Sequence, residues 1–148
     1  MKFSYDFKLS EHSGSSRVYV CGDITARIDF LSGSMMRVAL FRDDCKMLPT
    51  FTVDPQNEFL TEGRDKLSLD GFSLFAPQVN KTADGERFSL ENVEAELNTH
   101  NFVLSYKKDG KLLFADRAPL AYNFQNEFGN GTYHYLTREK GEKIYGTM

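Results

Sequence analysis

The stretch from Asn101 to Asp116 constrains the fold more than any other part of the sequence, because Asp109-Gly110 separates two apolar-rich runs within it. Asp-Gly tolerates the positive φ angles that a type I′ turn needs at its two central residues. The stretch therefore predicts an antiparallel β-hairpin with its turn at these two residues. The pairs expected across the hairpin are Lys107 with Leu112, Tyr106 with Leu113, and Ser105 with Phe114.

Both faces of this hairpin carry apolar side chains. One face is expected to hold Phe102, Leu104, Tyr106, Leu113 and Ala115, and the other Val103, Ser105, Lys107, Leu112 and Phe114. A hairpin with one face in water is usually more polar on that face. The pattern therefore predicts that other parts of the protein cover both faces in part.

Alternating apolar and polar residues predict further short strands along the chain. These strands are expected over residues 3–9, 18–20, 24–30, 36–41, 50–53, 72–76, 93–97, 121–124 and 133–137, with loops over 12–16, 79–85 and 128–131. Near residue 93 the spacing of Leu90, Val93 and Leu97 also fits a helix. We favour a strand, because a turn at Thr99-His100-Asn101 would bring Leu97 back against Phe102. Many short strands with little helix are typical of an all-β antiparallel sandwich or barrel.

Size and charge narrow the class of protein. A chain of 148 residues suits one domain spanning residues 1–148. The formal net charge of −3 provides no basic surface for nucleic acid, and no apolar run approaches the length of a membrane span. Because the first ten residues lack the continuous apolar segment of a secretory signal, we expect a cytoplasmic protein in which Cys21 and Cys45 are reduced.

The sequence shows no motif for metal binding or catalysis. His12, His100 and His134 are scattered, without the spacing of H-E-x-x-H or C-x-x-C sites. A glycine-rich phosphate loop and a G-x-S-x-G elbow are also missing. The sequence therefore predicts no metal, no cofactor and no catalytic residue.

Three segments in the last third of the chain resemble glycoside hydrolase family 31. They are Phe102-Val-Leu-Ser-Tyr-Lys-Lys-Asp-Gly-Lys-Leu-Leu-Phe, Asp116-Arg-Ala-Pro-Leu-Ala-Tyr122 and Gly141-Glu-Lys-Ile-Tyr-Gly146. The earlier runs Ile24-Thr-Ala-Arg-Ile-Asp-Phe and Met35-Met-Arg-Val-Ala-Leu-Phe are similar to the early strands of that family. The chain looks like the N-terminal β-sandwich domain of a family 31 α-glucosidase.

The resemblance implies a galactose-mutarotase-like supersandwich that precedes a (β/α)8 barrel carrying the catalytic aspartates. The parent enzyme would be a retaining glycosidase acting on terminal α-linked glucose, and the barrel is expected to be absent from this chain. The chain alone is therefore expected to be inactive. Its expected partners are the catalytic barrel of the same polypeptide and an oligosaccharide substrate. With Leu112 and Phe114 left uncovered by the missing barrel, the isolated domain is expected to self-associate.

Asp116 and Arg117 are the candidate carbohydrate contacts, because they are polar residues at a strand end; the competing interpretation is a surface ion pair. Two alternatives to the accessory domain remain. One is a freestanding carbohydrate-binding β-sandwich, although such modules commonly stack sugars on exposed Trp or Tyr and this chain has no Trp. The other is a small enzyme of mutarotase type, for which His100 and His134 lie outside any matching motif.

Overall fold

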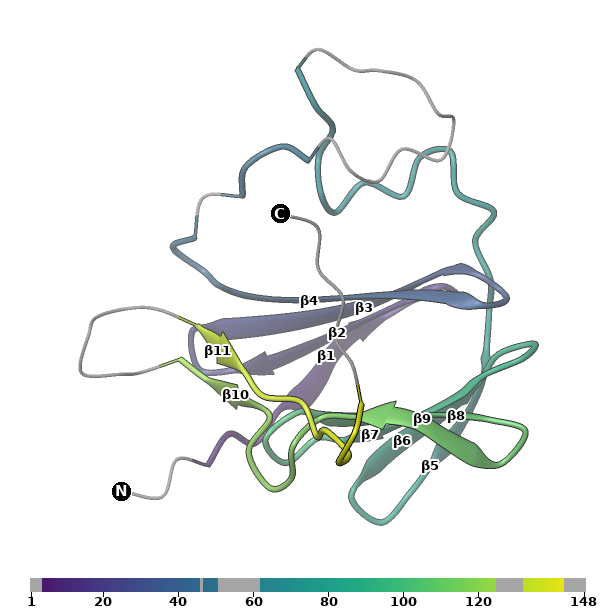
Figure 1. The fold of residues 1–148 in the computed structure, drawn as a ribbon. Helices are drawn as coiled ribbons and strands as arrows, with labels where there is room; N and C mark the ends of the chain where they lie inside the picture. The colour runs from purple at the N-terminus through teal and green to yellow at the C-terminus, as the bar shows by residue number, and fades with distance from the viewer. Residues whose placement is uncertain (1–3, 46, 51–61, 125–131, 143–148) are drawn as a thin grey trace. The chain divides into compact units, whose positions relative to one another are not determined.

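The computed structural model describes residues 4–45, 47–50, 62–124 and 132–142, and within these ranges the chain forms eleven β-strands and no helix. The strands form three antiparallel sheets, which Figure 1 shows. The all-β antiparallel prediction is therefore confirmed, and the architecture agrees with a β-sandwich class.

The chain divides into two compact units. One unit, Lys8–Gln78, contains a four-stranded sheet in the order β1 (Lys8–His12), β2 (Ser16–Cys21), β3 (Ile24–Ser32) and β4 (Met35–Arg42). The other unit combines Met1–Phe7 with Val79–Met148. Its strands are β5 (Gln78–Lys81), β6 (Gly85–Ser89), β7 (Glu94–Asn98), β8 (Val103–Lys108), β9 (Lys111–Ala115), β10 (Tyr122–Asn123) and β11 (Tyr133–His134). The single domain over residues 1–148 stays a prediction.

The four-stranded sheet follows the alternation in the sequence closely. Ile24, Ala26, Ile28 and Phe30 are all buried along β3, and β3 pairs with β4 across the expected turn. The expected strand at 72–76 is wrong, because this segment is irregular and contributes only a hydrogen bond from the Phe75 N–H to the Phe30 carbonyl, 3.1 Å long. Of the strand expected at 50–53, residue 50 forms an isolated bridge and the rest lies outside the described residues.

A buried carboxylate organises this unit. Asp29 has no exposed surface, and it accepts hydrogen bonds from Ser16 Oγ at 2.6 Å and Arg27 Nε at 2.8 Å on one oxygen. Its other oxygen accepts from Arg37 Nε at 3.0 Å and Arg37 Nη2 at 2.6 Å. Arg37 also donates to the carbonyls of Lys66, Leu67 and Ser68. One salt-bridged arginine thus fixes the irregular segment after residue 62 to β4.

The five-stranded sheet runs in the order β5-β6-β7-β8-β9. The strand interpretation of residues 93–97 is confirmed, since β7 pairs with both β6 and β8. The sequence pattern did not predict β6, and the residues of β5 were expected to lie in a loop. Gly85 begins β6 where the backbone comes so close to β7 that a Cβ there would lie 2.1 Å from the Leu97 carbonyl oxygen.

The N-terminal segment departs from the expected first strand. Among the described apolar residues of that expected strand, only Leu9 lies in β1, while Tyr5 and Phe7 belong to the other unit. Residue 3 lies outside the described residues. The Tyr5 carbonyl accepts from the Asn101 N–H at 2.6 Å, and the Phe7 ring packs 5.1 Å from the Phe102 ring. The segment therefore completes the aromatic core of its unit rather than extending β1.

The central hairpin forms as predicted, but its register does not. Asp109 and Gly110 have φ angles of 51° and 75°, as a type I′ turn requires, and Lys107 pairs with Leu112. A β-bulge then shifts the pairing, so that Tyr106 lies opposite Phe114, with Leu113 as the extra residue. The expected pairs of Tyr106 with Leu113 and Ser105 with Phe114 are therefore wrong. The assignment of Phe114 to the face opposite Tyr106 is wrong as well.

Candidate functional site

Asp116 follows β9 directly and is buried, with 4% of its surface exposed. Its backbone N–H donates to the Leu104 carbonyl at 2.8 Å, and its Oδ2 accepts from the Leu104 N–H, also at 2.8 Å. The side chain therefore extends the pairing between the end of β9 and β8. Because one carboxylate oxygen is occupied by the backbone, the free hydrogen-bonding capacity lies mainly on the other oxygen.

His134, on β11, contacts that other oxygen. Its Nε2 lies 2.8 Å from Asp116 Oδ1, and its ring stacks on Tyr122 with centroids 4.3 Å apart and an angle of 6°. A carboxylate oxygen accepts hydrogen bonds, so Nε2 of His134 is the donor in this contact. Asp116, Tyr122 and His134 thus form one polar-aromatic cluster that joins β9, β10 and β11.

Two phenols are perturbed by this cluster. Burial raises the pKa of Tyr106 above its ordinary range, and the negative charge of Asp116 adds to the effect. The pKa of Tyr122 is raised by burial, then by Asp116 and by Tyr106. Both hydroxyls therefore stay protonated at physiological pH, so neither is a base.

Arg117 has a different environment from its neighbour. Its side chain is exposed, its N–H donates to the Tyr135 carbonyl at 2.9 Å, and its guanidinium carbon lies 4.2 Å from the centroid of the Tyr135 ring. The competing interpretation, an ion pair between Asp116 and Arg117, does not describe this arrangement, because Asp116 is paired with His134 instead. Arg117 presents an exposed guanidinium that is held on an aromatic ring. The sugar-contact role of Asp116 and Arg117 stays a prediction.

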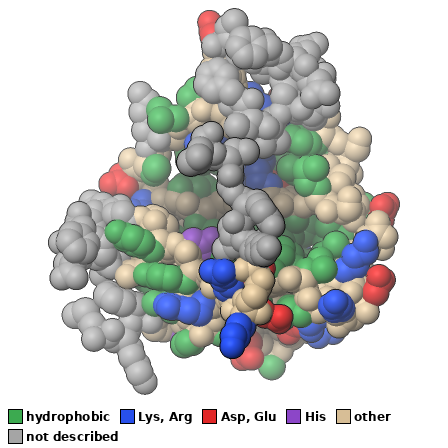
Figure 2. All heavy atoms as spheres, in the orientation of Figure 1, with side chains coloured by type: hydrophobic (Ala, Val, Ile, Leu, Met, Phe, Trp, Pro, Cys, Tyr) green, Lys and Arg blue, Asp and Glu red, His purple; other side chains and the backbone are tan. Residues whose placement is uncertain are grey.

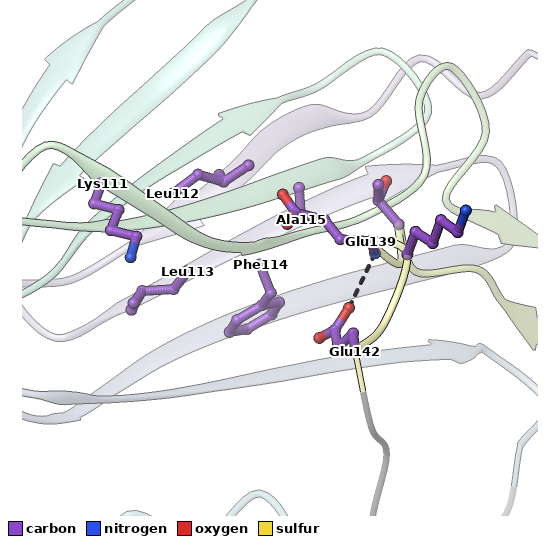
Figure 3. Close-up of a pocket in the computed structure, with 9 residues that line it drawn as sticks. Lys111, Leu112, Leu113, Phe114, Ala115, Glu139 and Glu142 are labelled. Atoms are coloured by element: carbon purple, nitrogen blue, oxygen red, sulfur yellow. Dashed lines mark hydrogen bonds between the residues drawn. The ribbon is translucent and has the colours of Figure 1, made fainter.

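A groove of about 410 Å³ lies beside β9. One wall is β9 itself, and the other is the segment 137–142, where the Glu139 N–H donates to Glu142 Oε2 at 3.1 Å (Figure 3). The figure also shows Leu113 and Phe114 on one side of β9 and Leu112 on the other. The bulge produces this arrangement, because it places two successive apolar side chains on the same side of the strand.

The β9 wall of the groove carries exposed apolar side chains, and the facing segment carries the charged Glu139, Lys140 and Glu142. Leu113 is 50% exposed and Phe114 is 47% exposed, although the Phe114 ring stacks on Tyr106 at 4.2 Å. Leu136, which pairs with Asp116 next to the groove, is 54% exposed. Hydrophobic side chains are visible at the surface in Figure 2 as well. The prediction that both hairpin faces are partly covered therefore holds for β8 but not for β9.

Other predicted features are also located in the structure. Cys21 is half-buried and Cys45 exposed, and both are free thiols. His100 contacts Asp6 on the exposed surface, and it lies apart from the cluster around His134. In the part of the chain that the structure describes, no three His, Cys, Asp or Glu residues gather as a metal site, and no helix is long and apolar enough to cross a membrane.

No protein-family model and no curated protein matches the sequence. Among solved structures, the chain is similar to a dextranase of glycoside hydrolase family 31 from Flavobacterium johnsoniae, determined with bound isomaltotriose. The TM-score is 0.54 at 19% sequence identity, over 82% of this chain. The chain spans only 14% of the length of the dextranase chain. The likeness shows a fold shared with part of a family 31 enzyme, which agrees with the resemblance in the sequence.

Proposed function

We propose that the chain is the non-catalytic N-terminal β-sandwich domain of a family 31 glycoside hydrolase. The observation that carries this proposal is the shared fold with a family 31 dextranase, combined with the family-like segments at residues 102–114, 116–122 and 141–146. The chain would pack on a catalytic barrel of the same polypeptide and help to shape its pocket. A fold alone does not determine a catalytic activity. In this proposal the catalytic activity belongs to the barrel.

The proposed substrate is an oligosaccharide with terminal α-linked glucose, cleaved by an α-glucosidase. The related dextranase was determined with isomaltotriose, so α-1,6-linked glucose is the first linkage to compare with maltose. A cytoplasmic location is part of the proposal.

The test is an assay of the natural polypeptide that contains this sequence, beside the 148-residue chain. We expect the longer protein to release glucose from maltose or isomaltotriose with retention of anomeric configuration, and the 148-residue chain to be inactive. Turnover by the 148-residue chain that survives repurification would contradict an accessory role. A longer protein without glycosidase activity would contradict the enzyme class.

A freestanding carbohydrate-binding domain is the second candidate. It is favoured by Arg117 lying on Tyr135, and by Tyr133, which is 44% exposed on the same strand segment. Sugar recognition of this kind uses aromatic faces with adjacent hydrogen-bond donors. Calorimetric titration of the 148-residue chain with isomaltotriose separates the two candidates. A freestanding binding domain should bind the sugar and lose this binding in Arg117→Ala, whereas the accessory domain should show no such binding.

A further inference from the structure

The segment 4–7 lies against the turn between β7 and β8 as a short strand. Asp6 and His100 form an antiparallel bridge, and Nδ1 of His100 lies 2.5 Å from Asp6 Oδ1. Two backbone hydrogen bonds flank this bridge, from the Phe7 N–H to the Thr99 carbonyl at 3.1 Å and from the Asn101 N–H to the Tyr5 carbonyl at 2.6 Å. Residues 6 and 100 are therefore a non-hydrogen-bonded pair, in which the Cα atoms lie about 4.5 Å apart.

Aromatic side chains of the segment 4–7 add to these backbone contacts. Phe7 is 4% exposed and packs on Phe102, which is fully buried. The Tyr5 ring meets the Phe124 ring edge-on, with centroids 5.5 Å apart and an angle of 82°. In β-strand addition, main-chain hydrogen bonds provide affinity and alternate side chains provide specificity. The site therefore fits an extended peptide in which an acidic residue stands between two aromatic ones.

The turn that receives the segment 4–7 is strained. Asn101 and Phe102 have φ angles of 64° and 50°, and a positive φ is a genuine outlier for a bulky residue such as Phe. A strained backbone of this kind persists where the surrounding contacts determine it. Tyr5 supplies two of these contacts, because its carbonyl accepts from the Asn101 N–H and its own N–H donates to Asn101 Oδ1 at 2.8 Å. The segment and the turn thus hold each other in place.

The connection between the segment 4–7 and β1 contains no spare residue. Phe7 is bonded to the β7–β8 turn, whereas Lys8 already pairs with Val20 in the four-stranded sheet of the other unit. A short hinge between two anchored elements favours the exchange of one element between identical chains. Such an exchange is a low-cost route to a dimer, because each segment finds the same contacts on the second copy that it makes on its own.

We propose that two copies of this chain exchange their 4–7 segments, so that the segment of each copy occupies the β7–β8 turn of the other. A second copy is the occupant because it presents the matching sequence Tyr5-Asp6-Phe7. The inference is independent of the proposed function. A short flexible linker gives an effective concentration in the millimolar range, so a second copy competes with the chain's own segment as the protein approaches about 1 mM.

Disulfide trapping between two kinds of copy tests the exchange. One copy is isotope-labelled and carries Asp6→Cys, and the other is unlabelled and carries His100→Cys. In both, Ser replaces the free thiols of Cys21 and Cys45. The pair 6 and 100 suits a disulfide, because Cα atoms joined by natural disulfides lie about 4.4–6.8 Å apart. We expect mass spectrometry to find a disulfide-linked heterodimer after oxidation at about 1 mM, with an initial yield that falls about tenfold on tenfold dilution by mass action.

Glu94→Cys and Lys107→Cys in separate copies are the matched control. Glu94 and Lys107 pair between β7 and β8, and both side chains are partly exposed. Exchange of the segment 4–7 does not bring these two residues together from different copies, so this mixture should give no heterodimer above random collision. Equal yields in the test and control mixtures would overturn the proposal.

A longer hinge is the second variant. Inserting Gly-Ser-Gly between Phe7 and Lys8 lets the segment reach the turn of its own copy without tension, so the yield of heterodimer should fall. A yield that the insertion leaves unchanged would contradict the exchange through this hinge.

Sedimentation of the unmodified chain provides a measurement that needs no cysteine variant. We expect a dimer whose fraction rises with protein concentration and falls on insertion of Gly-Ser-Gly after Phe7. A monomer at all concentrations up to about 1 mM would refute the exchange. A dimer without the disulfide-linked heterodimer would place self-association on another surface and would also refute it. None of these measurements depends on glycosidase activity, so they leave the proposed function untouched.

Discussion

Replacing Asp29 by asparagine removes the carboxylate that pairs with both Arg27 and Arg37 in the four-stranded sheet. The amide oxygen still accepts from one side, but the NH₂ group then points at a guanidinium, so one donor meets another. The Arg27 and Arg37 side chains are only 24% and 18% exposed, so water compensates for little of the loss. Breaking a buried ion pair in this way costs about 3–5 kcal/mol.

The matched control is Asp23→Asn, which breaks an ion pair with Arg42 at the surface. Asp23 is 57% exposed, and pairs of this kind contribute less than about 1 kcal/mol. The assay is urea unfolding followed by far-UV circular dichroism, with the free energy extrapolated to water. We expect Asp29→Asn to lower the free energy of unfolding by at least about three times as much as Asp23→Asn, because a broken buried ion pair costs about 3–5 kcal/mol and a surface pair less than about 1 kcal/mol.

A difference of less than about 1 kcal/mol between the two variants would refute the argument, because the buried cluster would then contribute no more than a surface pair. If Asp29→Asn does not fold, Ser16→Ala gives a milder perturbation. It removes one hydrogen bond to the carboxylate, 2.6 Å long, and should cost about 1.5–3 kcal/mol. A neutral Ser16→Ala would count equally against the cluster.

Three further predictions concern the unit that contains β5 to β11. Gly110→Ala should cost about 1 kcal/mol in urea unfolding because φ is +75° there, whereas Gly85→Ala should cost more because its Cβ would overlap a backbone oxygen. His134→Ala should lower the unfolding free energy by about 2 kcal/mol, since its buried carboxylate partner loses a hydrogen bond. The pKa values of Tyr106 and Tyr122 are raised in the folded protein, so the free energy of unfolding should fall as pH rises above 10.0, where the phenols of the unfolded chain ionise. The double variant Tyr106→Phe and Tyr122→Phe should show a smaller fall when unfolding is measured across this pH range.

Controls for these predictions come from the same chain. Gly14→Ala should be nearly neutral, because its Cβ would make only an ordinary contact of 3.7 Å with Ala76. His12→Ala should also have little effect, since His12 is exposed. A Gly85→Ala variant as stable as Gly14→Ala would contradict the close approach of β6 and β7.

Local chemistry explains which parts of the fold were predictable. Asp109-Gly110 determines its own turn, and the alternation around Ile28 reports burial on one face of β3, so both were predicted correctly. The bulge at Leu113 was not, because a register shift depends on the partner strand and leaves no mark in the pattern of a single strand. The alternation of Tyr5 and Phe7 was identified, but their place in the fold was not, because the hydrogen-bonding partner of Tyr5 is Asn101, 96 residues further along the chain.

The candidate site was less predictable for the same reason. Asp116 was selected for its place at a strand end, and the structure shows that it is buried. Its partner His134 lies 18 residues further along the chain, on a two-residue strand that carries no motif. A solitary histidine between two tyrosines becomes informative only once the backbone brings a carboxylate to it.

The position of Tyr5 and Phe7 has a consequence for the order in which the protein matures during synthesis. Tyr5 leaves the ribosome well before its hydrogen-bonding partner Asn101, which follows 96 residues later. The β1–β4 meander, whose strands each pair with their neighbours in sequence, can form in that interval. Tyr5 and Phe7 must wait, with their aromatic rings uncovered, until the β7–β8 turn is made. Completion of this unit therefore requires segments from both sides of the β1–β4 meander. A nascent chain that stalls before Phe102 keeps Tyr5 and Phe7 unpaired, as exposed apolar surface of the kind that chaperones bind.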